Sequence, residues 1–468
     1  PGGIMEVGMN IRELVLDMLL EMERERVYSN LLIRRVLDKY DDLPGKDKAF
    51  IKRVTEGTLE RRIQIDYIMD QFSKTPSGKM KPLIRNLLRM SVYQILFMDA
   101  VPDSAACNEA VKLAAKRKFQ SLKGFVNGVL RNIAREKDMI LSAGGKEGFY
   151  PDREKEPLAY LSVFYSMPEY FIVMWLEEYG MERTEKMLQA MLEVRPVTIR
   201  IRESLTEKEK EALLRDMGEA GIGAEQHPYL PYAYMLEHAE GVRNIPGFDE
   251  GLFAVQDVSS MISVECAGIE KGSFVVDVCA APGGKSAHGA EKTGEKGRVL
   301  ARDISEEKVD MIRENAERLR LENIEAEVFD ATEYDAELDG KADVVLADVP
   351  CSGLGILGRK RDIKYHMTRA TLAELPGIQR KILEKAQRYV KPGGILVYST
   401  CTIRREENEE NVRWFLGKFP FQGEDIRRSV AHIPQTGTAA DGYLQLLPGI
   451  HSADGFFIAV FRRKGNMC

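Results

Sequence analysis

Two cysteines and one aspartate stand where this 468-residue chain is expected to carry reactive groups. Cys351 lies in ADVPCSGLG (347–355) and Cys401 in YSTCTIRREENEENV (398–412), each just after an apolar stretch that predicts a buried strand. Asp348 precedes Cys351 by three positions. A thiolate adds to electrophilic carbon, and a second thiol or a carboxylate beside it can move protons. The three residues therefore indicate nucleophilic catalysis.

One reaction in particular needs two thiols and an acid. Carbon 5 of a pyrimidine is a poor nucleophile until a thiolate adds at carbon 6, which turns carbon 5 into an enamine able to accept a methyl group. The adduct must then lose its carbon 5 proton and expel the thiolate, a step that a second cysteine can assist. A carboxylate such as that of Asp348 can stabilise charge at N3 and the exocyclic amine, which favours cytosine.

The segment VVDVCAAPGGKSAH (275–288) predicts a strand, a glycine-rich turn and a helix, an arrangement that binds nucleotides or nucleosides. A phosphate-binding loop would need glycine where Cys279 stands, and Pro282 removes a backbone donor from such a loop. A dinucleotide fold lacks its G-x-G-x-x-G pattern here. S-adenosylmethionine remains, because it needs only close backbone approach at Gly283 and Gly284.

Two carboxylates follow the next strands and fit that ligand. Asp303 stands 20 positions after Gly283 and can accept hydrogen bonds from both ribose hydroxyls, and Asp330 can accept one from the adenine amino group. Each aspartate alone could equally cap a helix. Their places at successive strand ends favour a ligand.

The elements that must position these residues form a strand-and-helix alternation in the last third of the chain. We predict strands at 274–279, 298–304, 326–331, 343–349 and 394–400, with helices at 306–321 and 371–390 between them. Such a pattern predicts a mostly parallel sheet covered by helices on both faces, with ligands at the carboxyl ends of the strands.

The remainder divides into two further parts. Apolar residues recur at helical spacing from 10 to about 137, and SAGGKEGFYPDREKEP (142–157) then separates folded units. A helix, a strand at 197–202 and a second helix at 206–219 predict a small α+β unit. We place the domains at 9–141, 157–242 and 243–465.

Charge is distributed unevenly along the chain. The net charge is -6, yet residues 46–135 hold 18 Lys and Arg against 8 Asp and Glu. A basic module on an acidic protein favours contact with a polyanion, although a solvated helical surface would look the same. Within it we expect charge reversal at Lys116, Arg117 and Lys118 to weaken RNA binding.

Bulk composition excludes other classes of protein. No apolar run approaches the roughly 20 residues of a membrane helix, so we expect a cytosolic protein. The cysteines form no C-x-x-C pair and the six histidines have no metal-ligand spacing, so we expect neither disulfides nor a metal. The cysteines outside the site motifs are expected to be small buried hydrophobes, namely Cys107, Cys266 and Cys468.

Taken together, these motifs resemble the RNA (cytosine-5)-methyltransferase family over nearly the whole chain. VQDVSSM (255–261) before the sheet also matches, and FVNGVLRNI (125–133) resembles the NusB-like RNA-binding module of one subfamily. The resemblance implies an all-α NusB-like domain, a small α+β domain and a Rossmann-like class I methyltransferase domain. It implies Cys401 as the nucleophile, Cys351 as the residue that assists product release, and S-adenosylmethionine as the cofactor. The implied cofactor-binding residues are Cys279, Ala280, Ala281, Pro282, Gly283, Gly284, Lys285, Asp303, Asp330 and Asp348.

The resemblance also implies a substrate, 16S ribosomal RNA, acted on by a protein that we expect to be a monomer. Transfer RNA is the alternative with the same chemistry, and a non-catalytic RNA-binding factor is the alternative without it. Two departures lie in GILGRKRDIKY (355–365), where relatives usually carry Arg and Pro at the positions of Gly358 and Arg361. We expect this segment to border the target nucleotide, with Lys364 and Arg359 as candidates for RNA phosphate contact or as ordinary solvated side chains.

Overall fold

The chain forms two compact units, seen in a computed structural model that describes residues 10–142, 148–239 and 241–465. The first unit contains the chain up to Leu192 together with Leu357–His366, and the second contains Glu193–Ile356 and the chain from Met367 onward. None of the helices described is long and apolar enough to cross a membrane. These two units do not correspond one to one with the three domains that we placed at 9–141, 157–242 and 243–465. Those domain boundaries stay a prediction.

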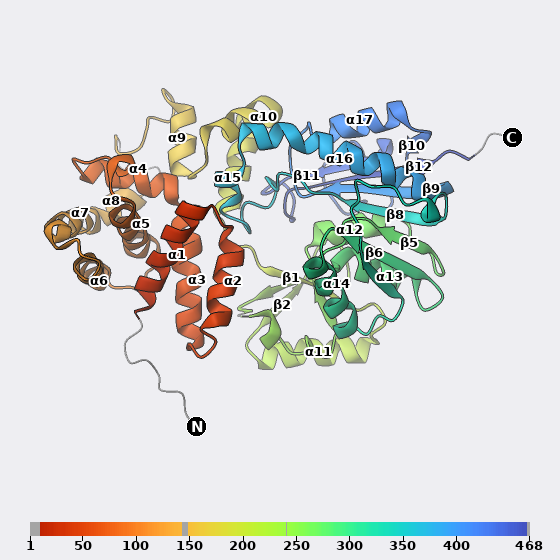
Figure 1. Ribbon diagram of the computed structural model, residues 1–468, viewed down its shortest axis with the longest axis horizontal. Helices are drawn as coiled ribbons and strands as arrows, with labels where there is room; N and C mark the ends of the chain where they lie inside the picture. The colour runs from red at the N-terminus through yellow and green to blue at the C-terminus, as the bar shows by residue number, and fades with distance from the viewer. Residues whose placement is uncertain (1–9, 143–147, 240, 466–468) are drawn as a thin grey trace. The chain divides into compact units, whose positions relative to one another are not determined.

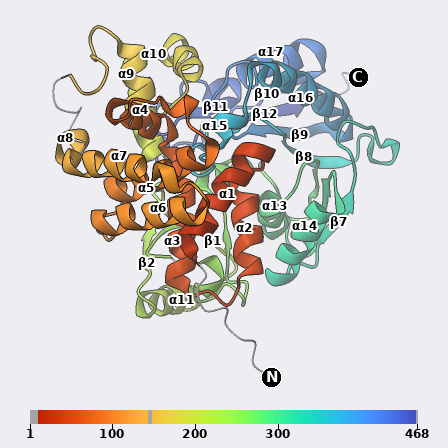
Figure 2. The same ribbon diagram turned by 60° about the vertical axis from the view of Figure 1, so that its left-hand side comes forward.

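The first unit is helical, as the apolar spacing predicts (Figures 1 and 2). The Asn10 side chain begins the first helix by accepting hydrogen bonds from two backbone amides. The fifth helix lies in the core, where nearly every side chain from Ile84 to Leu96 is buried. The helices are α1 (Ile11–Glu25), α2 (Ser29–Lys39), α3 (Gly45–Glu60), α4 (Arg62–Phe72), α5 (Pro82–Phe97), α6 (Asp103–Lys116), α7 (Lys123–Arg135), α8 (Lys137–Leu141), α9 (Pro157–Phe164), α10 (Glu169–Leu192) and α15 (Ile363–His366).

The second unit begins with a small antiparallel sheet of order β2-β3-β1-β4. Thr206 and Glu209 form a reciprocal capping box that starts its helix, so the predicted helix at 206–219 is confirmed. Buried apolar side chains of the sheet and this helix form its core. The elements are β1 (Val197–Ile201), α11 (Glu207–Glu219), β2 (Gly223–Gln226), β3 (Ala233–Glu237) and β4 (Phe253–Val255).

A larger sheet of order β10-β12-β9-β8-β5-β6-β7 makes up the rest of this unit. The five strands that the sequence predicts pair in parallel, which confirms the mostly parallel sheet. Beyond β9 the sheet continues with antiparallel strands: β12 pairs with β9, and β10 and β11 pair with β12. The sequence analysis did not predict these three strands. The strands are β5 (Phe274–Asp277), β6 (Arg298–Asp303), β7 (Ile324–Val328), β8 (Ala342–Asp348), β9 (Val390–Thr400), β10 (Phe421–Gly423), β11 (Tyr443–Leu446) and β12 (Phe456–Arg463).

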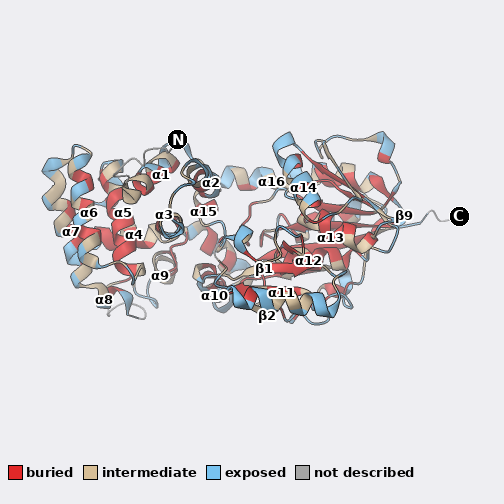
Figure 3. Ribbon diagram, turned by 90° about the horizontal axis from the view of Figure 1, so that it is seen from below, coloured by how far each residue is buried: buried red, intermediate tan, exposed pale blue. Residues whose placement is uncertain are grey.

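Helices cover both faces of this sheet, and the strands between them are largely buried (Figures 1 and 3). Successive strand residues point to opposite faces, so Val275 packs with α12 and α13 while Val276 packs with α16 and α17. Ile312 of α14 lies against Ala301 on the first of these faces. The helices are α12 (Val258–Cys266), α13 (Gly284–Thr293), α14 (Glu306–Arg318), α16 (Arg369–Tyr389) and α17 (Glu409–Lys418).

The third predicted strand is displaced along the chain. We expected it at 326–331, whereas β7 spans Ile324–Val328 and pairs with β6 from Val299 to Asp303. The next residues turn, because the Asp330 carboxylate accepts hydrogen bonds from the amide and hydroxyl of Thr332. Asp330 therefore lies in a turn two residues past the strand.

The loop after β8 approaches β12 so closely that it requires glycine. The amide of Gly455 donates to the carbonyl of Gly355 over 2.9 Å, and a Cβ at Gly355 would overlap the Gly455 carbonyl oxygen. At the exposed Gly377 in α16, a Cβ would meet no described atom within 4 Å. The first glycine is thus required by packing and the second is not.

We predict that Gly355→Ala lowers the free energy of unfolding by about 1–3 kcal/mol, because the added methyl group must displace backbone. Gly377→Ala is the matched control and should leave stability unchanged or raise it by up to about 1 kcal/mol. Urea unfolding followed by circular dichroism measures both. Equal stability of the two variants would contradict the close approach.

Candidate active site

The candidate site lies at the carboxyl-terminal edge of the large sheet, where adjacent parallel strands end. β8 ends at Asp348, β5 at Asp277 and β6 at Asp303. β8 pairs with β9 such that Asp348 lies opposite Ser399. The loops that follow β8 and β9 therefore leave the sheet at the same place, and each carries one of the two site cysteines.

The structure brings those two cysteines into direct contact. Sγ of Cys351 lies 3.2 Å from Sγ of Cys401, and both side chains are partly exposed. The contact with Cys401, together with burial, raises the pKa of Cys351 well above its ordinary value. Cys351 thus favours its protonated form, in which it can donate to the sulfur of Cys401.

Asp348 is held at the end of β8 by two donors. One carboxylate oxygen accepts a hydrogen bond from the Ser399 hydroxyl at 2.8 Å, and the other accepts one from Nζ of Lys285 at 2.6 Å. Lys285 also donates to the Ser260 hydroxyl over 3.2 Å. Because the lysine comes from the glycine-rich loop, this ion pair joins the loop after β5 to the end of β8.

The glycine-rich loop, residues 279–285, is fixed by hydrogen bonds that its backbone amides donate. The amide of Ala281 donates to Oδ2 of Asp303 at 2.9 Å, and the amide of Gly283 donates to the carbonyl of Ala280 at 2.7 Å. Gly283 has a φ of 100°, a conformation that residues with a side chain rarely adopt, and α13 starts immediately after it. Burial, with nearby carboxylates, raises the pKa of Cys279.

The two predicted ribose and adenine partners have different surroundings. Asp303 is buried and also accepts a hydrogen bond from Nζ of Lys308 at 2.9 Å. Asp330 is exposed, and hydrogen bonds from Thr332 lower its pKa. Neither aspartate is the residue that caps α14, where Ser305 precedes the first turn.

The structure adds a buried carboxylate that the sequence analysis did not select. Asp277 at the end of β5 accepts a hydrogen bond from the Ser286 hydroxyl at 2.6 Å, and its other carboxylate oxygen is buried with no partner among the described residues. Burial raises the pKa of Asp277 to about 7. Its place inside a predicted strand was the available signal, but nothing in the sequence marks it as fully buried.

Glu407 is a second residue that the sequence analysis missed. It is completely buried and accepts hydrogen bonds from the amide of Ser352 and from the Gln379 side chain, both at 2.9 Å. Arg404 balances its charge over 3.2 Å. Ser352 follows Cys351 directly, so Glu407 ties the loop of one site cysteine to the segment that follows the other. In the sequence it stands in an acidic run that predicts a solvated helix start.

The loops of Cys351 and Cys401 are also hydrogen-bonded to each other. The hydroxyls of Ser352 and Thr402 lie 2.7 Å apart, and the amide of Gly355 donates to the carbonyl of Cys401 at 3.0 Å. These contacts make the two loops one structure. The separation of the thiols is therefore set by backbone and not by flexible side chains alone.

The segment expected to border the nucleotide does not present Lys364 to solvent. Lys364 is 4% exposed and donates to two backbone carbonyls of the helical unit, so the expected contact with RNA phosphate is wrong for this residue. Arg361 forms ion pairs with Glu56 and Glu60 in the same unit. Arg359 is exposed, and its contact with RNA stays a prediction.

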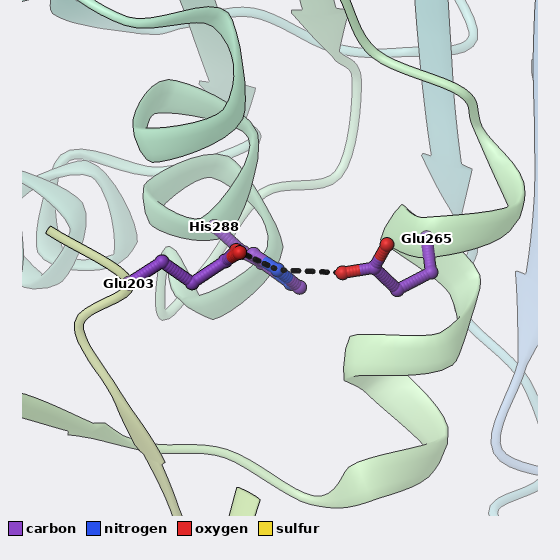
Figure 4. A group of neighbouring side chains, drawn as sticks. All are labelled: Glu203, Glu265 and His288. Atoms are coloured by element: carbon purple, nitrogen blue, oxygen red, sulfur yellow. Dashed lines mark ion pairs between the residues drawn. The ribbon is translucent and has the colours of Figure 1, made fainter. Parts of the chain in front are cut away.

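A separate cluster has the composition of a metal site. Ligand atoms of Glu203, Glu265 and His288 lie within 4.8 Å of one another (Figure 4). Nζ of Lys292, however, lies 2.7 Å from a carboxylate oxygen of each glutamate. Burial opposes ionisation of Glu265, but hydrogen bonds from His288, Lys292 and Tyr232 lower its pKa to about 2. The lysine supplies the positive charge, so we interpret the cluster as an ion-pair network.

Comparison with family models matches three successive parts of the chain. The NusB family model covers residues 9–135, the RsmF/B-like ferredoxin-like domain covers 167–243, and the 16S rRNA methyltransferase RsmB/F model covers 267–462. Among solved structures, a methyltransferase homolog from Pyrococcus horikoshii is 27% identical with a TM-score of 0.54, and covers 66% of this chain and 99% of that one. The structure of NSun6 from Pyrococcus horikoshii with SFG shares the fold at 23% identity and a TM-score of 0.55, covering 63% of this chain and 98% of that one.

These matches and the sheet define a class, an S-adenosylmethionine-dependent methyltransferase domain preceded by a NusB domain and a ferredoxin-like domain. Bacillus subtilis probable ribosomal RNA small subunit methyltransferase B is 36% identical over 97% of this chain and 99% of its own length. Klebsiella pneumoniae ribosomal RNA small subunit methyltransferase B is 30% identical over 99% of this chain and 100% of its own length. The chain therefore belongs to the 16S rRNA methyltransferase RsmB/F family, which confirms the family and fold class expected from the sequence.

We predict that Asp277→Asn becomes more stable relative to the wild type as the pH rises. The pKa of Asp277 is about 7 in the fold against an ordinary value of 3.8, so the folded state holds a proton that the unfolded state releases between these values, and the wild type loses stability there. Asparagine does not ionise, and the difference in unfolding free energy should grow by on the order of 3 kcal/mol from pH 4 to pH 7. Urea titrations at four pH values measure it. A difference that is flat or falls with pH would count against the buried acid.

Proposed function

We propose that this protein methylates carbon 5 of a cytosine in 16S ribosomal RNA through a covalent adduct between Cys401 and carbon 6 of the base. The observation that carries the proposal is the 3.2 Å contact between the two site thiols, whose loops follow the paired strand ends at Asp348 and Ser399. An acid and two thiols at one strand edge supply the nucleophile, the proton acceptor and the charge stabiliser that the reaction requires.

The cofactor residues fit S-adenosylmethionine by the chemistry of their groups. Carboxylates at the ends of neighbouring strands, such as Asp303 and Asp330, can accept hydrogen bonds from its hydroxyl and amino groups. The glycine-rich loop would hold it by backbone approach at Gly283 and Gly284. When bound, the cofactor supplies the electrophilic methyl group that carbon 5 accepts. Lys285 of this loop forms an ion pair with Asp348 at the end of β8.

The two cysteines take different roles in this proposal. We assign the nucleophile to Cys401 and the proton acceptor to Cys351, whose sulfur atoms lie 3.2 Å apart. Cys401 then attacks carbon 6 of the cytosine. After methylation, Cys351 in its thiolate form accepts the carbon 5 proton, and the carbon 6–sulfur bond breaks, which returns the Cys401 thiolate.

Asp348 serves the pyrimidine ring during this sequence. Its carboxylate is already oriented by Ser399 and Lys285, so little reorganisation is needed when charge develops at N3 and the exocyclic amine. A carboxylate there accepts from the amine of cytosine and repels the carbonyl of uracil. This preference supports cytosine as the base.

The base must leave its stack to reach a thiol on one face and a methyl donor beside it. Such unstacking costs a few kcal/mol, which phosphate contacts can offset. The relatives that cover nearly the whole chain are named for ribosomal RNA of the small subunit, which supports that substrate over transfer RNA. The thiol pair favours an enzyme over a purely RNA-binding factor.

We predict distinct outcomes for the two cysteine variants in methyl transfer from labelled cofactor to protein-free 16S RNA. Cys401→Ala should lose activity, because it removes the thiol that forms the bond to carbon 6. Cys351→Ala should form the adduct yet release it slowly, so that RNA-linked protein accumulates on a denaturing gel. Cys107→Ala, in the helical unit, is the matched control and should behave as the wild type.

Three results would change this proposal. Labelling of transfer RNA but not of 16S RNA would indicate that transfer RNA is the substrate. Cofactor binding without methyl transfer to either RNA favours the non-catalytic alternative. An adduct that persists in Cys401→Ala but disappears in Cys351→Ala reverses the two roles.

The structure also revises which basic residues of the helical unit can bind RNA. Lys116 pairs with Glu13 at 2.5 Å and Arg117 pairs with Glu13 at 3.3 Å, so acidic neighbours already balance both. Arg131 and Arg135 on α7 are exposed and have no acidic partner within 4.0 Å among the described residues. Their guanidinium groups bond only to asparagine side chains one turn away. They are better placed to neutralise phosphate.

We predict that Arg131→Gln/Arg135→Gln weakens RNA binding and lowers the slope of log affinity against log salt by about 1 for each phosphate that is no longer neutralised. Lys116→Gln/Arg117→Gln removes the same charge and should change the slope less. Filter binding at four salt concentrations measures both variants. A larger effect of the second pair would indicate that Lys116 and Arg117, and not Arg131 and Arg135, contact the RNA.

A further inference from the structure

The two site thiols are close enough for a reaction with each other that methyl transfer does not require. Both cysteines are free, and Sγ of Cys351 lies 3.2 Å from Sγ of Cys401. Both side chains are partly exposed, whereas Cys107 and Cys266 are buried. A disulfide bond is about 2.0 Å long, so the sulfur atoms have to approach each other by roughly 1 Å. A small oxidant in solution can therefore reach a pair of thiols that needs only a small movement to become bonded.

The backbone around the pair also suits a bond between the two sulfurs. Asp348 and Ser399 lie opposite each other on adjacent strands, and neighbouring strands are about 4.8 Å apart. Disulfides join residues whose Cα atoms are roughly 4.4–6.8 Å apart, a range that includes this separation. Beyond the strand ends the two loops stay together, because the hydroxyls of Ser352 and Thr402 lie 2.7 Å apart. The two segments that carry the thiols therefore run side by side.

The fold creates this pair from residues that are far apart in the chain. Cys351 and Cys401 are separated by 50 positions. In an unfolded chain, bringing them together costs the entropy of closing that loop. In the folded chain the backbone already holds them together, so each thiol meets the other at a high effective concentration. Reaction between the two thiols is therefore favoured over reaction of either one with a second molecule from solution.

We propose that Cys351 and Cys401 form a site of reversible oxidation, at which a peroxide converts the two thiols into one disulfide bond. The thiolate of one cysteine attacks a peroxide oxygen, and the O–O bond breaks to give a sulfenic acid. The hydroxide that leaves takes up the proton that this thiol had lost, which forms one water. The sulfur of the second cysteine then attacks the sulfenic sulfur, the S–O bond breaks, and the second thiol proton leaves with the oxygen as another water. The two sulfurs together lose the two electrons that the peroxide gains.

The bond has two consequences for the site. It consumes the sulfenic acid before further peroxide can oxidise it to a sulfinic acid, which thiols do not reduce. It also ties up the sulfur that attacks carbon 6, so methyl transfer should stop until a dithiol reverses the bond by thiol–disulfide exchange. The second consequence rests on the proposed function, whereas formation of the bond itself does not.

The experiment uses the full chain, reduced with dithiothreitol, desalted and treated with a few equivalents of hydrogen peroxide. Iodoacetamide then blocks the free thiols, the chain is digested without reduction, and linked peptides are identified by mass spectrometry. Cys351→Ala and Cys401→Ala each leave one member of the pair. Cys107→Ala, in the helical unit, keeps both members and is the matched control. The same treatment of the wild type in concentrated urea tests whether the fold is needed.

We expect a peptide that joins Cys351 to Cys401 in the folded wild type and in Cys107→Ala, and at least about tenfold less of it in urea. In Cys351→Ala, Cys401 should instead gain two oxygen atoms as a sulfinic acid that dithiothreitol does not reverse. Methyl transfer by the wild type should fall in proportion to the linked fraction and return after reduction with dithiothreitol.

Absence of the Cys351–Cys401 peptide from the folded wild type overturns the proposal. So does linkage of Cys279 to either cysteine in its place, because the reactive pair would then be a different one. Formation of sulfinic acid at Cys401 as fast in the wild type as in Cys351→Ala also overturns it, because the second thiol would not be capturing the sulfenic acid. If the link forms and is reversed while the reduced wild type methylates no RNA, the oxidation site stands and the proposed function fails.

Discussion

Parallel pairing of β8 with β9 is the constraint on which the candidate chemistry depends. With Asp348 opposite Ser399, the next few residues of both strands leave the sheet together, and Cys351 meets Cys401 at 3.2 Å. A slip of one residue would turn every side chain of β8 to the other face and remove Asp348 from the Ser399 hydroxyl. The buried apolar residues of both strands oppose such a slip, because each face packs against its own helices.

Around this pair of strands, buried charges are arranged so that each has a nearby partner. Lys285 balances Asp348, Arg404 balances Glu407, and Lys308 approaches Asp303. An ion pair of this kind adds little net stability, because its desolvation cost offsets most of the attraction. Its contribution is geometric, since removing one partner leaves the other unpaired in a poorly solvated place. The site therefore gains its order from paired charges, because an unpaired buried charge would cost more. Asp277 forms no ion pair among the described residues, and burial raises its pKa to about 7, so its carboxyl group holds a proton below that pH.

Sequence reasoning located the site because its signals are local. Strand periodicity and the residues that directly follow each strand were enough to place Asp303, Asp348, Cys351 and Cys401 at one edge, and the two thiols do meet there. What it missed depends on contacts between distant segments. Glu407 stands in an acidic run typical of a solvated helix start, and only the packing of α16 and the Cys351 loop buries it. Lys364 was assigned to the surface because a single lysine nearly always lies there.

The same limit explains the departures at Gly358 and Arg361. In the sequence they look like local changes beside the substrate, where a lost proline would weaken a loop. In the structure both positions belong to the helical unit, where a Cβ at 358 would lie 3.3 Å from the carbonyl oxygen of Met191 and two glutamates pair with the cation at 361. A residue close in sequence to a site motif can therefore serve contacts with a distant helix, which its position in the sequence does not reveal.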